Sequence, residues 1–258
     1  MKKAFTLAEV LITLGIIGIV AAMTLPTLIQ NSQQKETVAK LKKINSIMSQ
    51  AILRSVADNG EISSWGLVSW TSSDEDLSDE ENLANRAPLQ IFIEKIKPYL
   101  KIIAECGHGD KCSFDAVSER TSLDGTAFGT WGKESIVLPD GIVIRGITIY
   151  SPSCTAVRGS GLLSKICGEM FIDINGRKGP NATGKDVFLF YITNNGLIPM
   201  GTKEEADTSS FNFDNGCNLN RPSTLNGYGC AAWVIYNENL DYLKCSDLSW
   251  DGKRKCSK

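Results

Sequence analysis

The arrangement of apolar and polar residues predicts a membrane-spanning helix close to the N-terminus. From Val10 to Ile29 the only polar side chains are those of Thr13, Thr24 and Thr27, whose hydroxyl groups can bond to a helix carbonyl. As a helix this run would extend over about 30 Å, the thickness of a hydrocarbon core. The run is therefore long enough to cross a membrane.

Beyond Gln30 the helical pattern continues, but only one face stays apolar. Apolar residues recur every three or four positions, the spacing of an amphipathic helix, at Val38, Leu41, Ile44, Met48, Ile52 and Val56. Asp58-Asn59-Gly60 is a suitable end, because glycine adopts the left-handed conformation easily. We expect one continuous helix, with an apolar half at residues 5–30 and an amphipathic half at residues 31–60.

From residue 134 onward the sequence pattern changes to short runs of residues that favour β-strands. Residues 135–138 and 142–144 flank Pro139-Asp140-Gly141, which predicts a hairpin. Residues 170–174 and 187–192 predict two further strands. We therefore expect an α+β fold, in which the long helix packs on a small antiparallel sheet within a globular head at residues 61–258.

Charge and composition narrow the class of protein. The chain of 258 residues has 27 Lys and Arg against 29 Asp and Glu, so no nucleic-acid partner is expected from bulk charge. Its apolar content of 42% is ordinary for a globular protein. The lysines at positions 35, 40, 42 and 43 are interpreted as a solvated helix face.

The cysteines indicate an exported head. All eight lie between Cys106 and Cys256, a distribution typical of a disulfide-stabilised region outside the cytoplasm. Eight cysteines allow many pairings, and we expect nearest neighbours to pair because such loops close locally. The expected bonds are Cys106–Cys112, Cys154–Cys167, Cys217–Cys230 and Cys245–Cys256.

The single histidine offers little chemistry. His108 lies between Cys106 and Cys112, but no Cys-x-x-Cys spacing exists in the chain, which favours a disulfide loop over a metal site. A Ser-His-Asp arrangement would depend on His108 alone, and no phosphate or dinucleotide loop is present. We expect neither enzymatic activity nor a cofactor.

The first residues distinguish two interpretations of the apolar run. A basic start and the small pair Ala21-Ala22 would suit a secretory signal peptide, but an acid such as Glu9 at the head of the run does not. Lys2-Lys3-Ala4 followed by Phe5-Thr6-Leu7-Ala8-Glu9 and an unbroken apolar helix resembles the processing and methylation signal of type IV pilins and type II secretion pseudopilins.

This resemblance implies roles for individual residues. The prepilin peptidase would cut between Ala4 and Phe5, removing the leader at residues 1–4, and would methylate the new amine of Phe5. Glu9 would pair with that amine on a neighbouring subunit during assembly. Pro26 would match a helix-kinking proline. The sequence departs from the usual signal in having Ala4 in place of glycine and Ala8 in place of a larger aliphatic residue.

The stretch from Asp173 to Asp186 also resembles the connection between sheet strands in pseudopilin-like heads. Two interpretations of its oxygen-bearing residues stay open. They could collect around a calcium ion, or they could serve the tight turns that Asn, Asp and Gly favour. The residues concerned are Asp173, Asn175, Asn181 and Asp186.

Localisation and function follow from the resemblance and the cysteines together. We expect a single-pass inner-membrane protein with a periplasmic or extracellular head, although the four lysines beyond the span oppose the positive-inside rule. The implied function is a structural subunit, pseudopilin-like or minor pilin, whose partners are other such subunits and the prepilin peptidase. The alternative is a membrane-anchored extracellular binding protein that does not polymerise.

Overall fold

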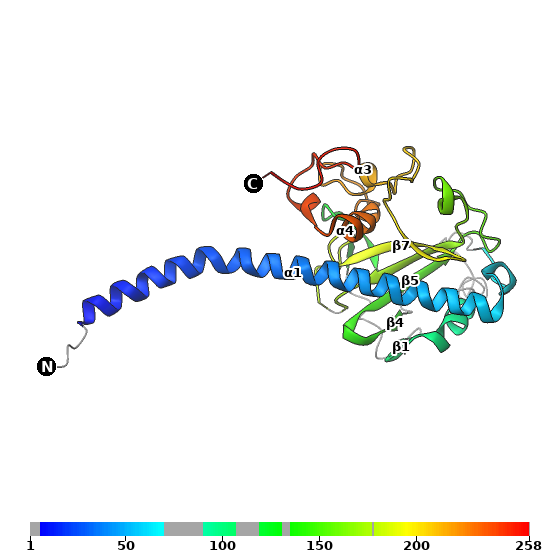
Figure 1. The fold of residues 1–258 in the computed structure, drawn as a ribbon, viewed down its shortest axis with the longest axis horizontal. Coiled ribbons are helices and arrows are strands. Elements are labelled where there is room, and N and C mark those ends of the chain that lie inside the picture. The colour runs from blue at the N-terminus through cyan, green and yellow to red at the C-terminus, as the bar shows by residue number, and fades with distance from the viewer. Residues whose placement is uncertain (1–5, 70–89, 107–118, 131–134, 177, 258) are drawn as a thin grey trace.

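One long helix projects from the head and also packs across it. The computed structural model describes residues 6–69, 90–106, 119–130, 135–176 and 178–257. Helix α1 (Leu7–Asn59) has 53 residues and is about 80 Å long. Its first half projects from the head and its second half lies across the head (Figure 1). It ends before Gly60, whose φ is +78°, so the end predicted at Asp58-Asn59-Gly60 is confirmed.

The described part of the head is built on an antiparallel sheet of six strands in the order β1-β4-β5-β6-β7-β8. A two-stranded sheet, β2-β3, lies beside it. The strands are β1 (Ala104–Cys106), β2 (Glu119–Thr121), β3 (Ala127–Thr130), β4 (Ser135–Val137), β5 (Val143–Ile149), β6 (Gly168–Asp173), β7 (Val187–Thr193) and β8 (Gly196–Pro199). The chain therefore has a pilin-like α+β fold, as the sequence predicts.

Helix α1 covers one face of this sheet. The predicted apolar stripe is buried at Leu41, Ile44, Met48 and Ile52, and Val38 and Val56 pack at its margins. Strand β7 supplies Phe188, Phe190 and Ile192 to the same core, which also receives Phe92 and Ile96 from a helical segment at residues 90–96. Alternate residues of β7 face the opposite side of the sheet because side chains alternate along a strand.

The opposite face of the sheet is covered by loops. Val187, Leu189 and Tyr191 of β7 contact a second core that includes Met200 and Tyr228. Two short helices follow, α3 (Phe213–Gly216) and α4 (Ala231–Asn237), and α4 returns to the side of α1 (Figure 1). Every residue of β7 is buried, so this strand is the centre of the head.

Candidate functional site

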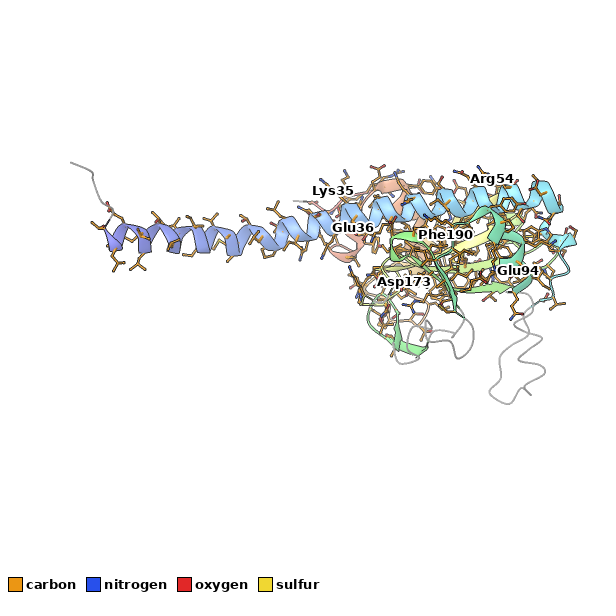
Figure 2. All side chains as sticks on the ribbon, turned by 90° about the horizontal axis from the view of Figure 1, so that it is seen from below. Lys35, Glu36, Arg54, Glu94, Asp173 and Phe190 are labelled. Carbon is orange, nitrogen blue, oxygen red and sulfur yellow. A yellow bond between two sulfur atoms is a disulfide. The ribbon has the colours of Figure 1, made fainter. Side chains whose placement is uncertain are left out.

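The projecting half of α1 is apolar on all sides, and its side chains pack against no other described segment of the chain. Its large apolar side chains between Leu7 and Ile29 are 42% to 78% exposed. Figure 2 shows them pointing outward around the helix. By length and composition, this is a described helix that could cross a membrane, with a mean hydropathy of 2.2. A helix that is apolar all round requires lipid or other protein around it.

An acidic side chain caps this helix at its start. Glu9 Oε2 accepts hydrogen bonds from the backbone nitrogen and the hydroxyl of Thr6, each at 2.8 Å. In return the backbone nitrogen of Glu9 donates to Thr6 Oγ1 at 3.3 Å, which completes a capping box. The positive end of the helix dipole also favours the carboxylate. Within a single chain, Glu9 is therefore held by its own helix.

The remaining polar groups of the apolar half are satisfied locally. Thr13, Thr24 and Thr27 donate their hydroxyl groups to helix carbonyl oxygens at 2.8 to 3.0 Å, as predicted. Pro26 lies inside the helix, and the projecting half is curved in Figure 1. A proline removes one backbone hydrogen bond and is a common cause of helix bending.

Two lysines in the second half of α1 form ion pairs with the head. Lys42 forms an ion pair with Glu238 after α4, and Lys43 forms one with Asp140 in the turn before β5. All four side chains are 41% to 65% exposed, so these pairs contribute little to stability. The solvated helix face expected from the sequence is thus partly a set of contacts with the head.

A buried ion pair organises the connection between β6 and β7. Arg145 of β5 donates to Asp173 Oδ2 from Nε at 2.9 Å and from Nη2 at 2.6 Å, and both side chains are almost fully buried. The same Nη2 group reaches the carbonyl of Gly176 and Asn181 Oδ1. Burial raises the pKa of Asp173 to about 6, against the opposing effect of the Arg145 guanidinium.

The four calcium candidates lie together, but protein donors already occupy their carboxylate oxygens. Asp173 Oδ1 accepts from the backbone nitrogens of Asn175 and Gly176 at 3.0 and 2.7 Å. Asp186 accepts from the backbone nitrogens of Asn181 and Ala182 and from Asn175 Nδ2. Within the described residues no three His, Cys, Asp or Glu side chains form a metal-binding group. Arg145, which the sequence pattern did not single out, supplies the positive charge beside Asp173.

A second buried acid joins β7 to the loop that follows β8. Glu205 Oε1 accepts from the hydroxyl groups of Tyr191 at 2.6 Å and Ser209 at 2.8 Å, and Oε2 accepts from the backbone nitrogen of Gly201. Burial raises the pKa of Glu205, and these hydrogen bonds oppose the rise. Since every contact is internal, this acid serves the fold.

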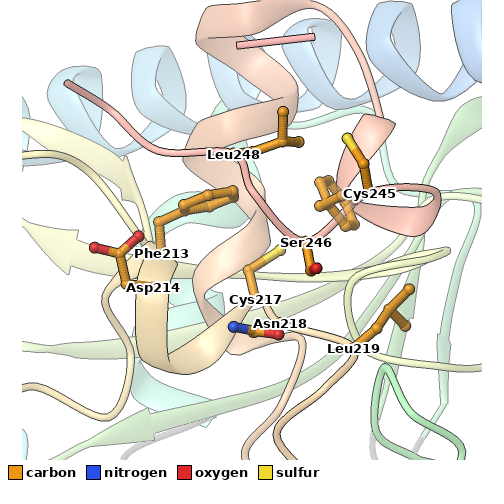
Figure 3. Close-up of a pocket in the computed structure, with 9 residues that line it drawn as sticks. Phe213, Asp214, Cys217, Asn218, Leu219, Cys245, Ser246 and Leu248 are labelled. Carbon is orange, nitrogen blue, oxygen red and sulfur yellow. The ribbon is translucent and has the colours of Figure 1, made fainter. Parts of the chain in front are cut away.

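Disulfides stabilise the loops around the C-terminal segment. Bonds join Cys154 to Cys167, Cys217 to Cys230 and Cys245 to Cys256, which are the nearest-neighbour pairs. Figure 3 shows the pocket between the last two bonds, which is lined by side chains including Phe213 and Leu248. Its volume of about 70 Å³ is small for an organic ligand, whose sites usually measure roughly 300 Å³ or more.

Several predicted residues lie outside the described part of the chain. These are Ala4 and Phe5 of the predicted cleavage site, together with His108 and Cys112. Cys106 is disulfide-bonded, and its predicted partner Cys112 is not described. The cleavage site and the histidine loop therefore remain predictions from the sequence.

Comparison with known proteins adds two family matches. Residues 1–25 match the prokaryotic N-terminal methylation motif. Residues 27–143 match a family of unknown function (DUF6613). The chain has no significant match among the curated proteins or the solved structures. The first match covers the predicted leader, the capping box and most of the apolar half of α1.

Proposed function

The chain carries the N-terminal methylation signal of type IV pilins and pseudopilins, and on this premise we propose that it is a structural subunit of a type IV pilus or a type II secretion pseudopilus. The observation that carries the proposal is the unpartnered apolar half of α1 with Glu9 in its first turn. Such a surface is stable only within lipid or among other helices of the same kind. One such subunit would occupy both environments in turn, lipid before assembly and neighbouring helices after it.

Before assembly, the apolar half of α1 anchors the subunit in the inner membrane and the head lies outside the cytoplasm. Prepilin peptidase removes residues 1–4 and methylates Phe5. The capping box supports this stage, because Thr6 gives the Glu9 carboxylate two hydrogen bonds at the edge of the bilayer. A carboxylate left without donors there would be costly.

During assembly, the helix leaves the lipid and packs among the helices of neighbouring subunits. Glu9 exchanges donors of its own cap for the N-terminal amine of an adjacent subunit. Burial of the apolar surface supplies the affinity. The charge pair supplies the register, which is the best-attested role of buried ionic groups.

Within this class we favour a pseudopilin-like or minor pilin subunit over a major adhesive pilin. The basis is the large head, in which eight cysteines lie beyond residue 105. The competing function is a membrane-anchored extracellular binding protein that never polymerises. The subunit function requires the Glu9 charge for assembly after the protein is folded and exported. The binding-protein function does not.

Two variants of the capping box test the proposal in the native host. Glu9→Ala removes the carboxylate, whereas Thr6→Ala removes only the hydroxyl and leaves the backbone donor of residue 6 in place. We expect Glu9→Ala to abolish incorporation into sheared or cross-linked filaments, with normal membrane insertion and disulfide formation. Thr6→Ala should assemble at close to the wild-type level.

The outcomes separate the mechanisms. Normal assembly of Glu9→Ala would exclude the charge pair as the source of register. Equal loss in both variants would assign the effect to helix capping. The mass of the mature N-terminus provides an independent measurement: methylated Phe5 supports the proposed class, and a start near Met23 contradicts it.

A further inference from the structure

A groove lies where the projecting half of α1 enters the head. It runs between α1 and the connection from β6 to β7, and its volume is about 350 Å³. Gln33, Thr37 and Lys40 line it from the helix, and Asn175, Lys178 and Lys185 line it from the connection. Figure 2 labels Lys35 and Glu36 at this junction. The groove is therefore on the side of the head from which the apolar half of α1 emerges.

The groove contains two lysines that have no ion pair with any described residue. Lys40 is paired with Glu36 at 2.8 Å. The oxygens of Asp186 accept hydrogen bonds from two backbone nitrogens and one side-chain amide. Both acids of the groove are thus engaged. Lys178, whose charge also acts on Glu36, and Lys185 form no ion pair within the described residues. The chemistry that remains available is that of an anion-binding site.

The mouth of the groove, at Gln33, lies at the depth of the polar layer of a membrane. At 1.5 Å per helical residue, Gln33 lies about 6 Å beyond Ile29 at the end of the apolar run, and Lys40 lies about 16 Å beyond it. The polar layer of one leaflet is roughly 5–7 Å thick, and lysine side chains can extend several ångströms toward it. Phosphate groups of that leaflet are accordingly within reach of the mouth of the groove.

We propose that this groove binds the phosphate of an anionic phospholipid headgroup in the leaflet that faces the head. The proposal rests on the membrane-anchored state in the proposed function. Lysine serves as a point charge for phosphate, and no planar or bidentate geometry is needed. Held in this way, the head lies against the membrane until assembly withdraws the helix.

Lipid binding by the full chain in neutral detergent micelles tests the site. Native mass spectrometry would compare the apparent affinity for phosphatidylglycerol with that for phosphatidylcholine of the same chain length. The test variant is Lys178→Gln/Lys185→Gln. The matched control is Lys101→Gln/Lys165→Gln, which neutralises two exposed lysines outside the groove. All four substitutions remove one charge each at surface or partly exposed positions.

We expect wild type and control to prefer phosphatidylglycerol by at least tenfold. Each groove lysine should account for roughly a fivefold preference, so the test variant should lose about 25-fold in affinity for the anionic lipid. Equal affinity of wild type for both lipids, or an unchanged test variant, would overturn the proposal. Full competition by millimolar glycerol phosphate would also overturn it, because the site would then serve a soluble anion.

Lipid preference and filament assembly are separate measurements, so failure of the groove can be told from failure of the proposed function. A chain that assembles into filaments without any lipid preference would contradict only the groove. A chain that prefers the anionic lipid but never assembles would contradict the subunit function and leave the groove intact.

Discussion

The backbone nitrogen of Leu197 donates a hydrogen bond to Ser49 Oγ at 3.0 Å, joining β8 directly to α1. The neighbouring residue, Gly196, has a φ of +106°, and a Cβ atom placed on it would lie 2.8 Å from Ser49 Cβ. Strand and helix can approach this closely because residue 196 has no side chain. The contact fixes where along α1 the head is attached.

Gly196→Ala should destabilise the head strongly. The substitution combines the cost of a left-handed conformation, about 1–2 kcal/mol, with overpacking against the helix, about 1–3 kcal/mol more. Gly125→Ala is the matched control, because Gly125 has a φ of +91° but nothing within 4 Å of its Cβ position. Urea unfolding followed by tryptophan fluorescence would measure the free energy of unfolding of both variants. Equal losses would show that the close approach to Ser49 has no energetic weight.

Arg145→Ala should destabilise the protein by about 3–5 kcal/mol, because it leaves the buried Asp173 carboxylate without its cation. Arg54→Ala provides a control on exposed α1 surface and should change stability by less than about 0.5 kcal/mol. Thermal unfolding of the full chain in detergent would compare them. A loss below about 1 kcal/mol for Arg145→Ala would mean that the ion pair is not a significant support of the connection between β6 and β7.

The stability contributed by Asp124 should depend on pH. Burial raises the pKa of this carboxyl, but hydrogen bonds from Ser122, Thr126 and Ser223 outweigh that effect and hold the pKa below its usual range. A group whose pKa is depressed by folding stabilises the fold above its unfolded pKa near 3.8, and that stability is lost as the pH falls toward the folded pKa.

Asp124→Asn should accordingly be less stable than wild type at pH 7, by about 1 kcal/mol because solvent screens this partly exposed carboxylate, and the difference should shrink below about pH 4. The exposed Asp207→Asn is the control and should follow wild type throughout. Free energies of unfolding between pH 7 and pH 3 would provide the measurement. A difference that stays constant over this range would show that the carboxylate charge is not responsible.

Removal of divalent cations should leave stability unchanged. The carboxylate oxygens of Asp173 and Asp186 accept hydrogen bonds from the protein, and Arg145 provides the neighbouring positive charge. We therefore expect the same unfolding temperature in excess EDTA and in millimolar calcium. A clear rise with calcium that disappears in Asp186→Asn would restore the calcium interpretation of this segment.

The parts of the fold that follow a regular pattern could be predicted from the sequence. The stripe from Val38 to Val56 identified the face of α1 that packs on the head, and Gly60 marked its end. Strands β6 and β7 were predicted because each contains a run of large apolar residues, three in β6 and six in β7. The turn at Pro139-Asp140-Gly141 lies between β4 and β5, as expected.

What could not be predicted depends on contacts between distant segments. Strand β8 begins at Gly196, directly after Asn195, and ends at Pro199, so its composition resembles a turn. Only its pairing with β7 and the approach of α1 make it a strand. Arg145 lies 28 residues before Asp173, and nothing local to either residue indicates their pairing. The hydrogen bonds within residues 173–186 follow from local turn chemistry, whereas the cation beside Asp173 comes from β5.

The continuity of α1 has a mechanical consequence. A ladder of backbone hydrogen bonds, interrupted only at the nitrogen of Pro26, connects the apolar half to the half that packs on the head and bonds to it through Ser49. Helices are stiff along their axis, and Pro26 permits bending without removing that stiffness. An axial displacement of the apolar half is therefore transmitted to the head. The distance that the head moves then reports how far the apolar half has moved.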